Sequence, residues 1–528
     1  MSIATLHYKS PPSSKVIEGL SPSSQQSIDA AVEIVRSHKD EWVALGIRER
    51  VDILETLIKD VAATAERWTT LSCEAKGTCL DNSASIEEWL GGPYLILHNL
   101  RQLRQSLLDI ETYGHPKIPG SVTTRPNGQV VAQVFPQNLY DRLFYLGISA
   151  EVWLEPGVNP LTLSQTQALI YQNKNHPGKV ALVLGAGNYS CIGPTDFLYK
   201  LFVEDQVVVY KTNPILAYLD ALIEEGFRTL IERGYLRVIS GSVAEGTYLA
   251  HHPHIDEIHL TGSDKTYEAI VFGSGPEGAK RKAEHQPLLT KRFTGELGNV
   301  SPVIVVPGPW RKQDLHYQAQ QLASMLVVNA GFNCLSTRVI INHAGWPQRE
   351  QLLHKTREQF TQIPLRKAYY TGAHERYQDF ITAHPEAEQF GPTFDSQLPW
   401  TLIAGLDPDN KNDICFTTEA FCSLFAETAI DAASTPEYID HAVEFANNRL
   451  WGTLNATLIV HPDSLKDPAT AAAVERAIEN LRYGTVAINQ WAVVGYGLIS
   501  PTWGGFPGHT IDDIQSGIGV VHNTLMFS

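Results

Sequence analysis

The sequence lacks several features that mark other classes of protein. It contains no apolar run long enough to span a bilayer. Residues 1–9 show neither the basic and apolar regions of a signal peptide nor the bias of a transit peptide. The 41 Lys and Arg residues are outnumbered by 57 Asp and Glu residues, which gives a formal net charge of −16. A negative overall field repels polyanions, so nucleic acid is not an expected partner.

Cysteine is scarce and shows no pairing pattern. The six cysteines stand at positions 73, 79, 191, 334, 415 and 422, and include neither a Cys-x-x-Cys pair nor ligands at zinc spacing. We therefore expect reduced thiols, no metal centre and a cytoplasmic protein. His251-His-Pro-His254 offers possible ligands, but no cysteine or acidic partner completes a set. A loop at a helix end is the favoured interpretation of that segment.

An alternation of helical and strand patterns organises much of the chain. Apolar residues recur at helical spacing over 28–35 and 51–61, which predicts two amphipathic helices at the start of the fold. Short β-branched runs follow at 180–184, 207–210, 236–239, 258–260 and 303–306, with helical patterns such as 219–231 between them. Strands that alternate with helices favour a parallel, doubly wound α/β sheet. A chain of 528 residues should form two or three domains.

Residues 115–178 interrupt this alternation. They mix Pro, Gly and aromatic residues with short alternating runs, which predicts an extended arm. The aromatic-rich part of the arm, 135–153, could line a tunnel for an apolar substrate or rest on a membrane, but packing within the arm is the favoured interpretation. A second α/β region spans 313 to about 489, and a Gly-rich stretch that starts at Trp503 leads into a strand-like tail.

Two short segments carry residues suited to one reaction. Cys334 follows a helical run in a Gly-containing turn, Asn-Ala-Gly-Phe-Asn-Cys, that can expose its sulfur. A thiolate attacks a carbonyl readily, and the thioester that forms needs a water that a carboxylate such as Glu296 can deprotonate. Glycines at 295 and 298 would let a ligand approach Glu296 closely. Taken singly, a cysteine is more often an inert buried group and a glutamate a surface carboxylate.

From about residue 24 to the C-terminus the sequence resembles the aldehyde dehydrogenase superfamily. The Phe-Thr-Gly-Glu-Leu-Gly-Asn segment around Glu296 and the segment that ends at Cys334 carry the resemblance. It implies that Cys334 is the nucleophile and that Glu296 activates the hydrolytic water. It also implies that the side-chain amide of Asn188 and the backbone N–H of Cys334 stabilise the oxyanion. Without the resemblance, an Asn after a Gly would be interpreted as a turn residue.

The same resemblance implies a nicotinamide cofactor, NAD or NADP. Lys211, which ends the strand-like run Val-Val-Val-Tyr-Lys, would hydrogen-bond the adenosine ribose. Gly262 and Ser263 would meet the pyrophosphate at a helix N-terminus. Glu419 would hold the nicotinamide ribose, and Phe421 would pack against the nicotinamide. Gly185-x-Gly187 is by itself a weak dinucleotide-binding signal, because the third glycine is missing.

Three features depart from the family pattern near the cofactor segments. Tyr267 replaces a common second glycine, and Pro214 stands where NAD-preferring members often carry a glutamate. The segment 272–291 is longer than usual and carries Lys280-Arg-Lys282, a basic run of a kind that is most often a solvated face. A carboxylate near the ribose would repel the 2′-phosphate of NADP. Because Pro214 lacks one, we expect NADP to be accepted or even preferred.

The resemblance implies a three-part fold. Residues 1–295 would form N-terminal helices and a Rossmann-type cofactor domain with the arm, residues 296–490 an α/β catalytic domain, and residues 491–528 a C-terminal return with a β strand for oligomerisation. Strand pairing between subunits would give a homodimer or a homotetramer. The implied function is the oxidation of an aldehyde to a carboxylic acid.

Two alternatives stay open at this point. Acyl transfer to coenzyme A is one, and the presence of Glu296 argues against it. A catalytically silent member that acts as a binding or structural protein is the other. The complete set of candidate catalytic residues argues against that second alternative.

Overall fold

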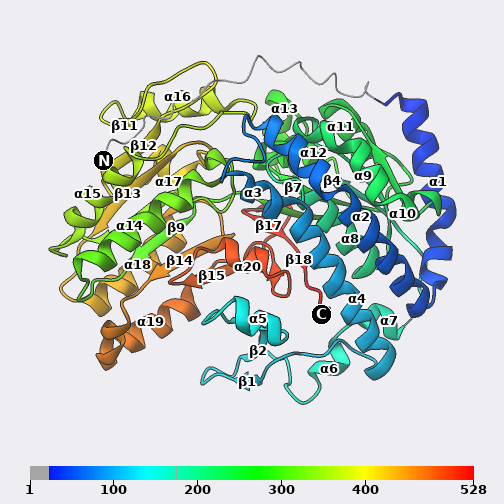
Figure 1. Ribbon diagram of the computed structural model, residues 1–528, viewed down its shortest axis with the longest axis horizontal. Helices are drawn as coiled ribbons and strands as arrows, with labels where there is room; N and C mark the ends of the chain where they lie inside the picture. The colour runs from blue at the N-terminus through cyan, green and yellow to red at the C-terminus, as the bar shows by residue number, and fades with distance from the viewer. Residues whose placement is uncertain (1–22, 174) are drawn as a thin grey trace.

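The computed structural model describes residues 23–173 and 175–528 and contains two large β-sheets, each accompanied by helices (Figure 1). One sheet has six strands in the order β17-β8-β7-β4-β5-β6, and the other has seven in the order β11-β12-β13-β10-β9-β14-β15. Neighbouring strands are parallel except at two edges, where β17 pairs antiparallel with β8 and β11 with β12. The predicted parallel α/β fold is therefore confirmed.

The six-stranded sheet contains four of the predicted strand runs. Its strands are β4 (Val180–Leu184), β5 (Val207–Lys211), β6 (Leu236–Ile239), β7 (Glu257–Gly262), β8 (Arg292–Leu297) and β17 (Gly517–Ile518). β4 and β5 are buried along their whole length, as expected of strands covered by helices on both faces. The sequence patterns did not predict β8, because its Gly295 and Glu296 are poor strand formers.

Helices cover this sheet and begin where the sequence predicts. The two amphipathic helices are α1 (Gln25–Ala44) and α2 (Ile47–Ala75), and α1 starts after Ser24, whose hydroxyl accepts a hydrogen bond from the Ser27 N–H. The other helices of this half are α3 (Ser85–Trp89), α4 (Leu95–Tyr113), α8 (Ile192–Phe202), α9 (Asp220–Gly226), α10 (Arg228–Glu232), α11 (Val243–His251), α12 (Asp264–Val271) and α13 (Gly275–Ala283). A π-helical turn, Leu90–Tyr94, joins α3 to α4, and a 3-10 turn, Pro214–Leu219, precedes α9.

The seven-stranded sheet is also packed on both faces. Its strands are β9 (Pro302–Val305), β10 (Val339–His343), β11 (Glu388–Phe390), β12 (Trp400–Leu406), β13 (Leu424–Ile430), β14 (Asn455–Ile459) and β15 (Thr485–Ile488). Along β9, Val303 and Val305 join one apolar cluster while Ile304 joins another. Successive strand residues point to opposite faces, so this alternation shows a core on each side of the sheet.

Six helices and two 3-10 turns accompany the second sheet. They are α14 (Lys312–Val327), α15 (Arg349–Phe360), α16 (Ala373–Ala383), α17 (Ile414–Thr417), α18 (Thr435–Arg449) and α19 (Pro468–Asn480), with turns at Val328–Gly331 and Pro462–Lys466. Residues of α14 and α15 share one apolar cluster, and residues of α18 and α19 share the other. The helices therefore divide between the two faces of the sheet.

The predicted arm contains a small antiparallel sheet of β1 (Val122–Thr124), β2 (Val130–Phe135) and β3 (Ala150–Trp153). Helices α5 (Leu139–Phe144), α6 (Leu163–Thr166) and α7 (Leu169–Gln172) complete it, along the lower edge of Figure 1. Packing within the arm accounts for only part of its aromatic segment. Phe135 is buried, but Tyr140 and Phe144 are 73% and 79% exposed. The expectation of simple packing is wrong for those two side chains, because α5 presents them to solvent.

The C-terminal return folds back onto the six-stranded sheet. After α20 (Val493–Gly497) come β16 (Thr502–Trp503), β17 and β18 (Val521–His522). β17 lies beside β8 with Gly517 opposite Glu296, and β16 pairs with β18. The boundary expected between residues 295 and 296 thus falls inside β8. Pairing of the C-terminal strand with another subunit stays a prediction.

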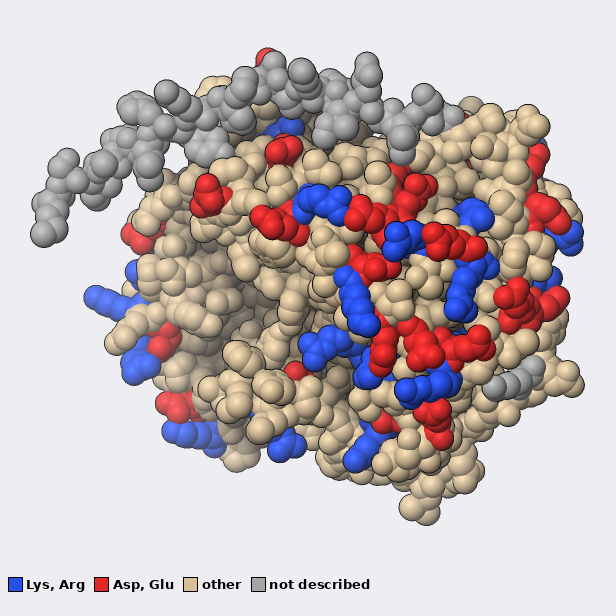
Figure 2. Space-filling view, turned by 45° about the vertical axis from the view of Figure 1, so that its right-hand side comes forward, with Lys and Arg blue, Asp and Glu red and all other residues tan. Residues whose placement is uncertain are grey.

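Charge on the surface is dispersed. In Figure 2 acidic and basic side chains alternate over the right-hand part of the molecule without forming a large area of one sign. Among residues 23–173 and 175–528, no helix is both long enough and apolar enough to cross a membrane. All six cysteines are free thiols.

Candidate active site

Cys334 ends a tight loop between α14 and β10. Asn329, Ala330 and Gly331 in this loop all have positive φ angles, of 55°, 56° and 80°. Such angles are unfavourable for residues other than glycine, so neighbouring structure must hold the loop in place. A Cβ on Gly331 would lie 2.4 Å from the Cys422 carbonyl oxygen. The loop is therefore pressed against the segment that follows Glu419.

A buried arginine, Arg338, joins these two segments. Its Nη2 donates to the Gly331 carbonyl at 2.7 Å, and its Nη1 donates to the Cys422 carbonyl at 2.8 Å. The Cys334 carbonyl accepts hydrogen bonds from Ser301 Oγ and Asn455 Nδ2, each at 3.3 Å. These bonds fix the backbone on both sides of the Cys334 sulfur.

Asn188 lies beside the same loop, and its backbone carbonyl makes the connection. That oxygen accepts hydrogen bonds from Asn329 Nδ2 at 3.1 Å, Tyr369 Oη at 3.1 Å and Lys76 Nζ at 2.9 Å. Lys76 in turn pairs with Glu88 at 2.9 Å, and both side chains are almost fully buried. The structure therefore brings the Asn188 segment to the Cys334 loop and holds both against α2 and α3.

Glu296 is a buried carboxylate with one oxygen held in place. The Trp503 indole Nε1–H donates to Glu296 Oε1 at 2.5 Å, while Oε2 has no hydrogen-bond partner among the described residues. Burial raises the pKa of Glu296 to about 8, the negative charge of Asp196 adds to this, and the Trp503 hydrogen bond opposes it. A carboxylate with a pKa near neutral is suited to general-base work.

Cys334, Glu296 and Glu419 share one electrostatic environment. Cys334 is half-buried, so part of its surface stays accessible while protein atoms surround the sulfur. Burial raises the pKa of its thiol well above the usual range, and the charges of Glu296 and Glu419 raise it further. The thiol is therefore protonated at neutral pH in this state, and its attack on a carbonyl requires a group that takes the proton.

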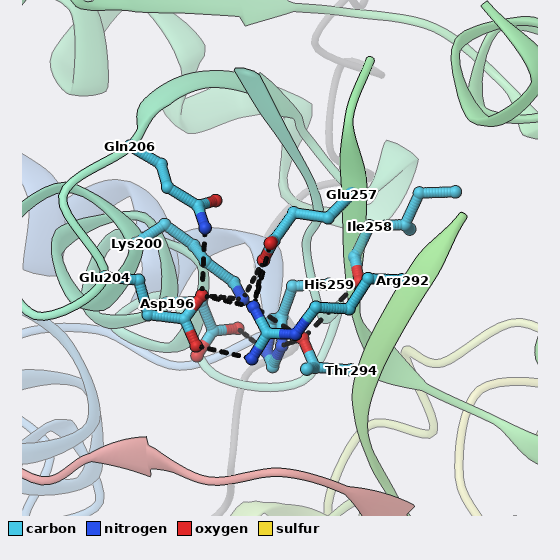
Figure 3. A network of polar contacts seen from close by, with 9 residues as sticks. All are labelled: Asp196, Lys200, Glu204, Gln206, Glu257, Ile258, His259, Arg292 and Thr294. Atoms are coloured by element: carbon cyan, nitrogen blue, oxygen red, sulfur yellow. Dashed lines mark hydrogen bonds and ion pairs between the residues drawn. The ribbon is translucent and has the colours of Figure 1, made fainter. Parts of the chain in front are cut away.

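A polar network beneath Glu296 fastens α8 to β7 and β8 (Figure 3). Asp196 accepts a hydrogen bond from Thr261, which lies opposite Glu296 in the β7–β8 pairing. Further along, Lys200 Nζ lies 2.8 Å from Glu257 and 2.7 Å from Glu204. Removing one member of a buried ion pair leaves an uncompensated charge, so this network fixes the position of α8 and of the Asp196 charge.

Glu419 and Phe421 lie next to the Cys334 loop. Burial raises the pKa of Glu419 to about 7, and the charge of Arg338 opposes the rise. A Cβ on Gly298 would lie 1.9 Å from Glu419 Oε2, so only glycine leaves room for this carboxylate. The Phe421 ring lies 6.1 Å from the ring of Phe332, in the loop that ends at Cys334. The structure thus brings these two predicted cofactor residues to the nucleophile.

The other predicted cofactor residues follow the carboxyl ends of β5 and β7. Lys211 is 6% exposed, and burial lowers the pKa of its ammonium to about 8 against the opposing charges of Glu245 and Asp220. Gly262 ends β7, and Ser263 caps α12, its hydroxyl accepting a hydrogen bond from the Thr266 N–H. Ligands of open α/β sheets bind outside this edge, so these residues are placed for one ligand.

The departures from the family pattern have simple structural explanations. Tyr267 is buried in the core, with its ring 5.0 Å from that of Phe293 and its hydroxyl donating to the Ile511 carbonyl. Pro214 starts the turn before α9. In the basic run, Arg281 donates to the Phe272 carbonyl and Lys282 pairs with Glu268 at 2.6 Å. Two of the three basic side chains are therefore engaged locally.

The histidine-rich segment is a helix end, as predicted. α11 ends at His251, and His252 caps it and lies 3.4 Å from Asp29.

Comparison with known proteins agrees with this geometry. Residues 165–378 match the sequence model of the aldehyde dehydrogenase family. This part of the chain therefore carries the sequence pattern of that family. A putative aldehyde dehydrogenase of Staphylococcus aureus (strain bovine RF122 / ET3-1) is 24% identical over 483 residues, which cover 85% of this chain and 89% of that protein.

Solved structures of aldehyde dehydrogenases share the fold over nearly the whole chain. An aldehyde dehydrogenase from Mycobacterium tuberculosis complexed with NAD+ matches with a TM-score of 0.62 and 19% identity, covering 95% of this chain and 88% of that one. The NADP-dependent glyceraldehyde-3-phosphate dehydrogenase from Bacillus halodurans C-125, complexed with NADP, matches with a TM-score of 0.63 and 17% identity, covering 95% and 89%. Both likenesses concern the fold.

Sequence reasoning missed four residues that build this site. They are Lys76, Asp196, Arg338 and Trp503. Lys76, Asp196 and Arg338 are charged residues that would be placed at the surface by composition rules. Trp503 acts on Glu296 across 207 residues. No local pattern carries such a contact, so only the folded chain reveals it.

Proposed function

We propose that this chain is a member of the aldehyde dehydrogenase superfamily that oxidises an aldehyde to a carboxylic acid, with NAD or NADP as hydride acceptor. One observation carries the proposal: the buried carboxylate of Glu296, which keeps one oxygen without a partner among the described residues, lies close enough to Cys334 for its charge to act on the thiol. Burial brings the pKa of Glu296 to about 8. That combination suits formation of a thioester and its hydrolysis.

The reaction begins at Cys334. The thiol gives up its proton to solvent, the sulfur adds to the aldehyde carbon, and the oxyanion that forms faces the Asn188 side-chain amide and the Cys334 backbone N–H. A bound nicotinamide cofactor would supply the hydride acceptor, and loss of hydride from the adduct would leave a thioester on Cys334. Glu296 Oε2, which has no partner within the described chain, then accepts a proton from water. The resulting hydroxide adds to the thioester, and collapse of the adduct releases the carboxylic acid and the Cys334 thiolate. The proton held by Glu296 then returns to the sulfur.

The residues present suit a dinucleotide. Lys211 would meet the adenosine ribose, Gly262 and Ser263 the pyrophosphate, and Glu419 the nicotinamide ribose, with Phe421 against the nicotinamide. Glu419 Oε1 is buried and has no hydrogen-bond partner among the described residues, so a ribose hydroxyl would satisfy it. The names of two structural neighbours include NAD+ and NADP respectively. Either cofactor is therefore proposed for this chain.

The first test separates thioester formation from hydrolysis. Glu296→Gln should give a burst of about one equivalent of reduced cofactor per active site and then nearly stop, because the thioester forms but is not hydrolysed. Rapid-mixing absorbance measures the burst. Cys334→Ala should show neither burst nor turnover, while cofactor binding persists. The matched control is Cys79→Ser, which removes an exposed thiol and should keep normal turnover.

Two results would contradict the proposal. Near-normal turnover by Cys334→Ala would show that another group is the nucleophile. A slow trace without a burst in Glu296→Gln would show that Glu296 acts before hydride transfer, for example by taking the thiol proton. Detection of an acyl-coenzyme A in place of free acid would favour the acyl-transfer alternative.

A further inference from the structure

Three side chains with metal-binding atoms meet at a place in the catalytic half that the reaction does not use. His384 follows the end of α16, Asp413 precedes α17, and Cys415 lies in its first turn. Their ligand atoms all lie within 4.8 Å of one another. Asp413 and Cys415 are buried, and the His384 side chain is 12% exposed. Among the described residues, no other such group of three or more His, Cys, Asp and Glu side chains is found.

Local backbone structure holds the three residues in place. His384 caps α16 through its N–H, which donates to the Phe380 carbonyl. Asp413 caps α17, because its Oδ1 accepts a hydrogen bond from the Cys415 N–H at 2.9 Å. Asn410 Nδ2 lies 3.4 Å from the second carboxylate oxygen, Asp413 Oδ2. The cluster is thus built on two helix ends, and small side-chain movements suffice to close it around an ion.

The hydrogen bonding of His384 also suits a metal ligand. Its Nδ1 lies 2.9 Å from Glu386 Oε1, and its Nε2 lies 3.1 Å from Asp413 Oδ1. Histidines that bind metals usually donate the second ring N–H to a carboxylate, as His384 can to Glu386. The neutral ring then presents a lone pair at Nε2 toward a carboxylate oxygen. A cation between Nε2 and Asp413 Oδ1 would make this arrangement favourable.

The separation of the His384 and Asp413 ligand atoms is close to that of two ligands on one zinc ion. Tetrahedral Zn²⁺, with bonds of about 2.0–2.3 Å, places its ligand atoms about 3.3–3.6 Å from one another. Nε2 and Oδ1 are 3.1 Å apart, close to that separation. Imidazole nitrogen, thiolate sulfur and carboxylate oxygen are the donors that zinc takes in proteins. Mg²⁺ and Ca²⁺ prefer sites made entirely of oxygen ligands.

We propose that His384 Nε2, the Asp413 carboxylate and the Cys415 thiolate bind one Zn²⁺ ion. A water molecule completes four-coordination, and Glu386 orients the imidazole ring. The S–H bond of Cys415 breaks as the zinc–sulfur bond forms, so binding releases one proton to solvent. The ion ties the end of α16 to the start of α17. None of the three proposed ligands is among the residues assigned to the reaction, so the proposed role of the ion is structural.

The position of α17 gives this site a consequence for cofactor binding. α17 ends at Thr417, two residues before Glu419, whose carboxylate we assign to the nicotinamide ribose. An ion that anchors the first turn of α17 also limits the movement of the Glu419 segment. This consequence rests on the proposed function, whereas the zinc site itself does not.

The test measures metal content without relying on activity. Full-length protein is prepared with Cys334→Ser in every sample, so that the catalytic thiol cannot hold metal. After dialysis with Zn²⁺ and then with a weak chelator, elemental analysis should find about one zinc per chain. Cys415→Ser and His384→Gln should each retain less than about a tenth of that amount. Cys79→Ser, which removes an exposed thiol outside the cluster, should retain all of it.

A second measurement identifies the sulfur ligand. Co²⁺ bound at the site should give a near-ultraviolet thiolate-to-metal band and visible bands of tetrahedral intensity, and Cys415→Ser should lose the near-ultraviolet band. Circular dichroism must show that each variant folds. If Cys415→Ser does not fold, His384→Gln, which retains the Cys415 thiol, tests the site in its place. Equal zinc content in the parent and in folded Cys415→Ser would overturn the proposal. If the wild-type protein binds zinc but shows no aldehyde oxidation, the proposed function is contradicted and the zinc site is not.

Discussion

At the scale of single residues, one tryptophan tempers the basicity that burial gives to Glu296, the proposed base. The indole hydrogen bond from Trp503 lowers the pKa of the Glu296 carboxylate, whereas burial raises it. Trp503→Phe removes this hydrogen bond. Because Glu296 works unprotonated, turnover should rise with pH through about 8 in the parent enzyme. A lost hydrogen bond to a charged group is worth about 1.5–3 kcal/mol, so the rise should move upward by about one to two pH units.

The control for this prediction is a second tryptophan. The indole of Trp491 donates to the Leu335 carbonyl at 2.7 Å and not to a titrating group. Trp491→Phe should therefore change kcat without moving the pH profile. An unchanged profile in Trp503→Phe would mean that the hydrogen bond does not set the basicity of Glu296. The profiles of kcat against pH for both variants decide the matter.

Cofactor choice is also decided by single side chains. Pro214 provides no carboxylate, and we expect NADP to be accepted or preferred, but Glu245 acts electrostatically on Lys211 from α11. Glu245→Gln removes that charge and should raise the ratio of kcat/KM for NADP over NAD about tenfold, or 1.4 kcal/mol. Pro214→Glu should move the ratio toward NAD. Glu232→Gln, on the surface of α10, should leave the ratio unchanged.

A parent enzyme that prefers NAD by more than about a hundredfold, roughly 2.7 kcal/mol, would contradict the expectation for NADP. Equal ratios in Glu245→Gln and the parent would show that Glu245 lies too far from the cofactor to matter.

At the scale of elements, the loop after α14 combines strain with close packing. Gly331→Ala places a side chain at a φ of 80°, with its Cβ 2.4 Å from the Cys422 carbonyl oxygen. Gly405 in β12 has a similar φ of 75° but nothing within 4 Å of its Cβ position. Gly405→Ala should cost about 1 kcal/mol of unfolding free energy from backbone strain alone. Gly331→Ala should cost more, about 2–4 kcal/mol, and should lower kcat as the Cys334 loop shifts.

Chemical denaturation and steady-state kinetics measure these two effects. Equal losses of stability in the two variants would show that the Cys422 segment gives way easily and that close packing does not hold the loop.

The elements also show what the sequence can and cannot predict. The run 180–184 became β4 with the same bounds, because a short β-branched run between turn residues has few other stable conformations. β8 was missed because Gly295 and Glu296 are chosen for the site and not for strand propensity. The candidate nucleophile and base were found through motifs, but their support by Trp503 and Arg338 depends on contacts between distant segments.

At the scale of the whole molecule, the arm exposes apolar side chains that the rest of the described chain does not cover. Leu139, Tyr140, Leu143, Phe144 and Leu146 are each at least 60% exposed. Exposed apolar patches of this kind often mark contacts between proteins. We expect a homodimer or homotetramer, with a mass in solution two or four times 58.4 kDa. Tyr140→Ser combined with Phe144→Ser should lower that mass, as light scattering after size-exclusion chromatography will measure.

A charge-neutral surface change on the opposite half, Tyr317→Ser on α14, is the matched control and should leave the mass unchanged, since Tyr317 is 51% exposed outside the arm. A monomeric parent protein would refute the expectation of an oligomer. An unchanged assembly in the double variant would place the interface elsewhere.

The pairing of β17 with β8 has a consequence for the order in which the protein becomes active. The residues that supply the thiol and its loop precede residue 335, but the strand beside Glu296 and the indole that holds it come from residues 517 and 503. During synthesis, therefore, the nucleophile leaves the ribosome long before the base is fixed. A chain cut short before residue 503 would lack both the strand beside Glu296 and the indole that holds its carboxylate.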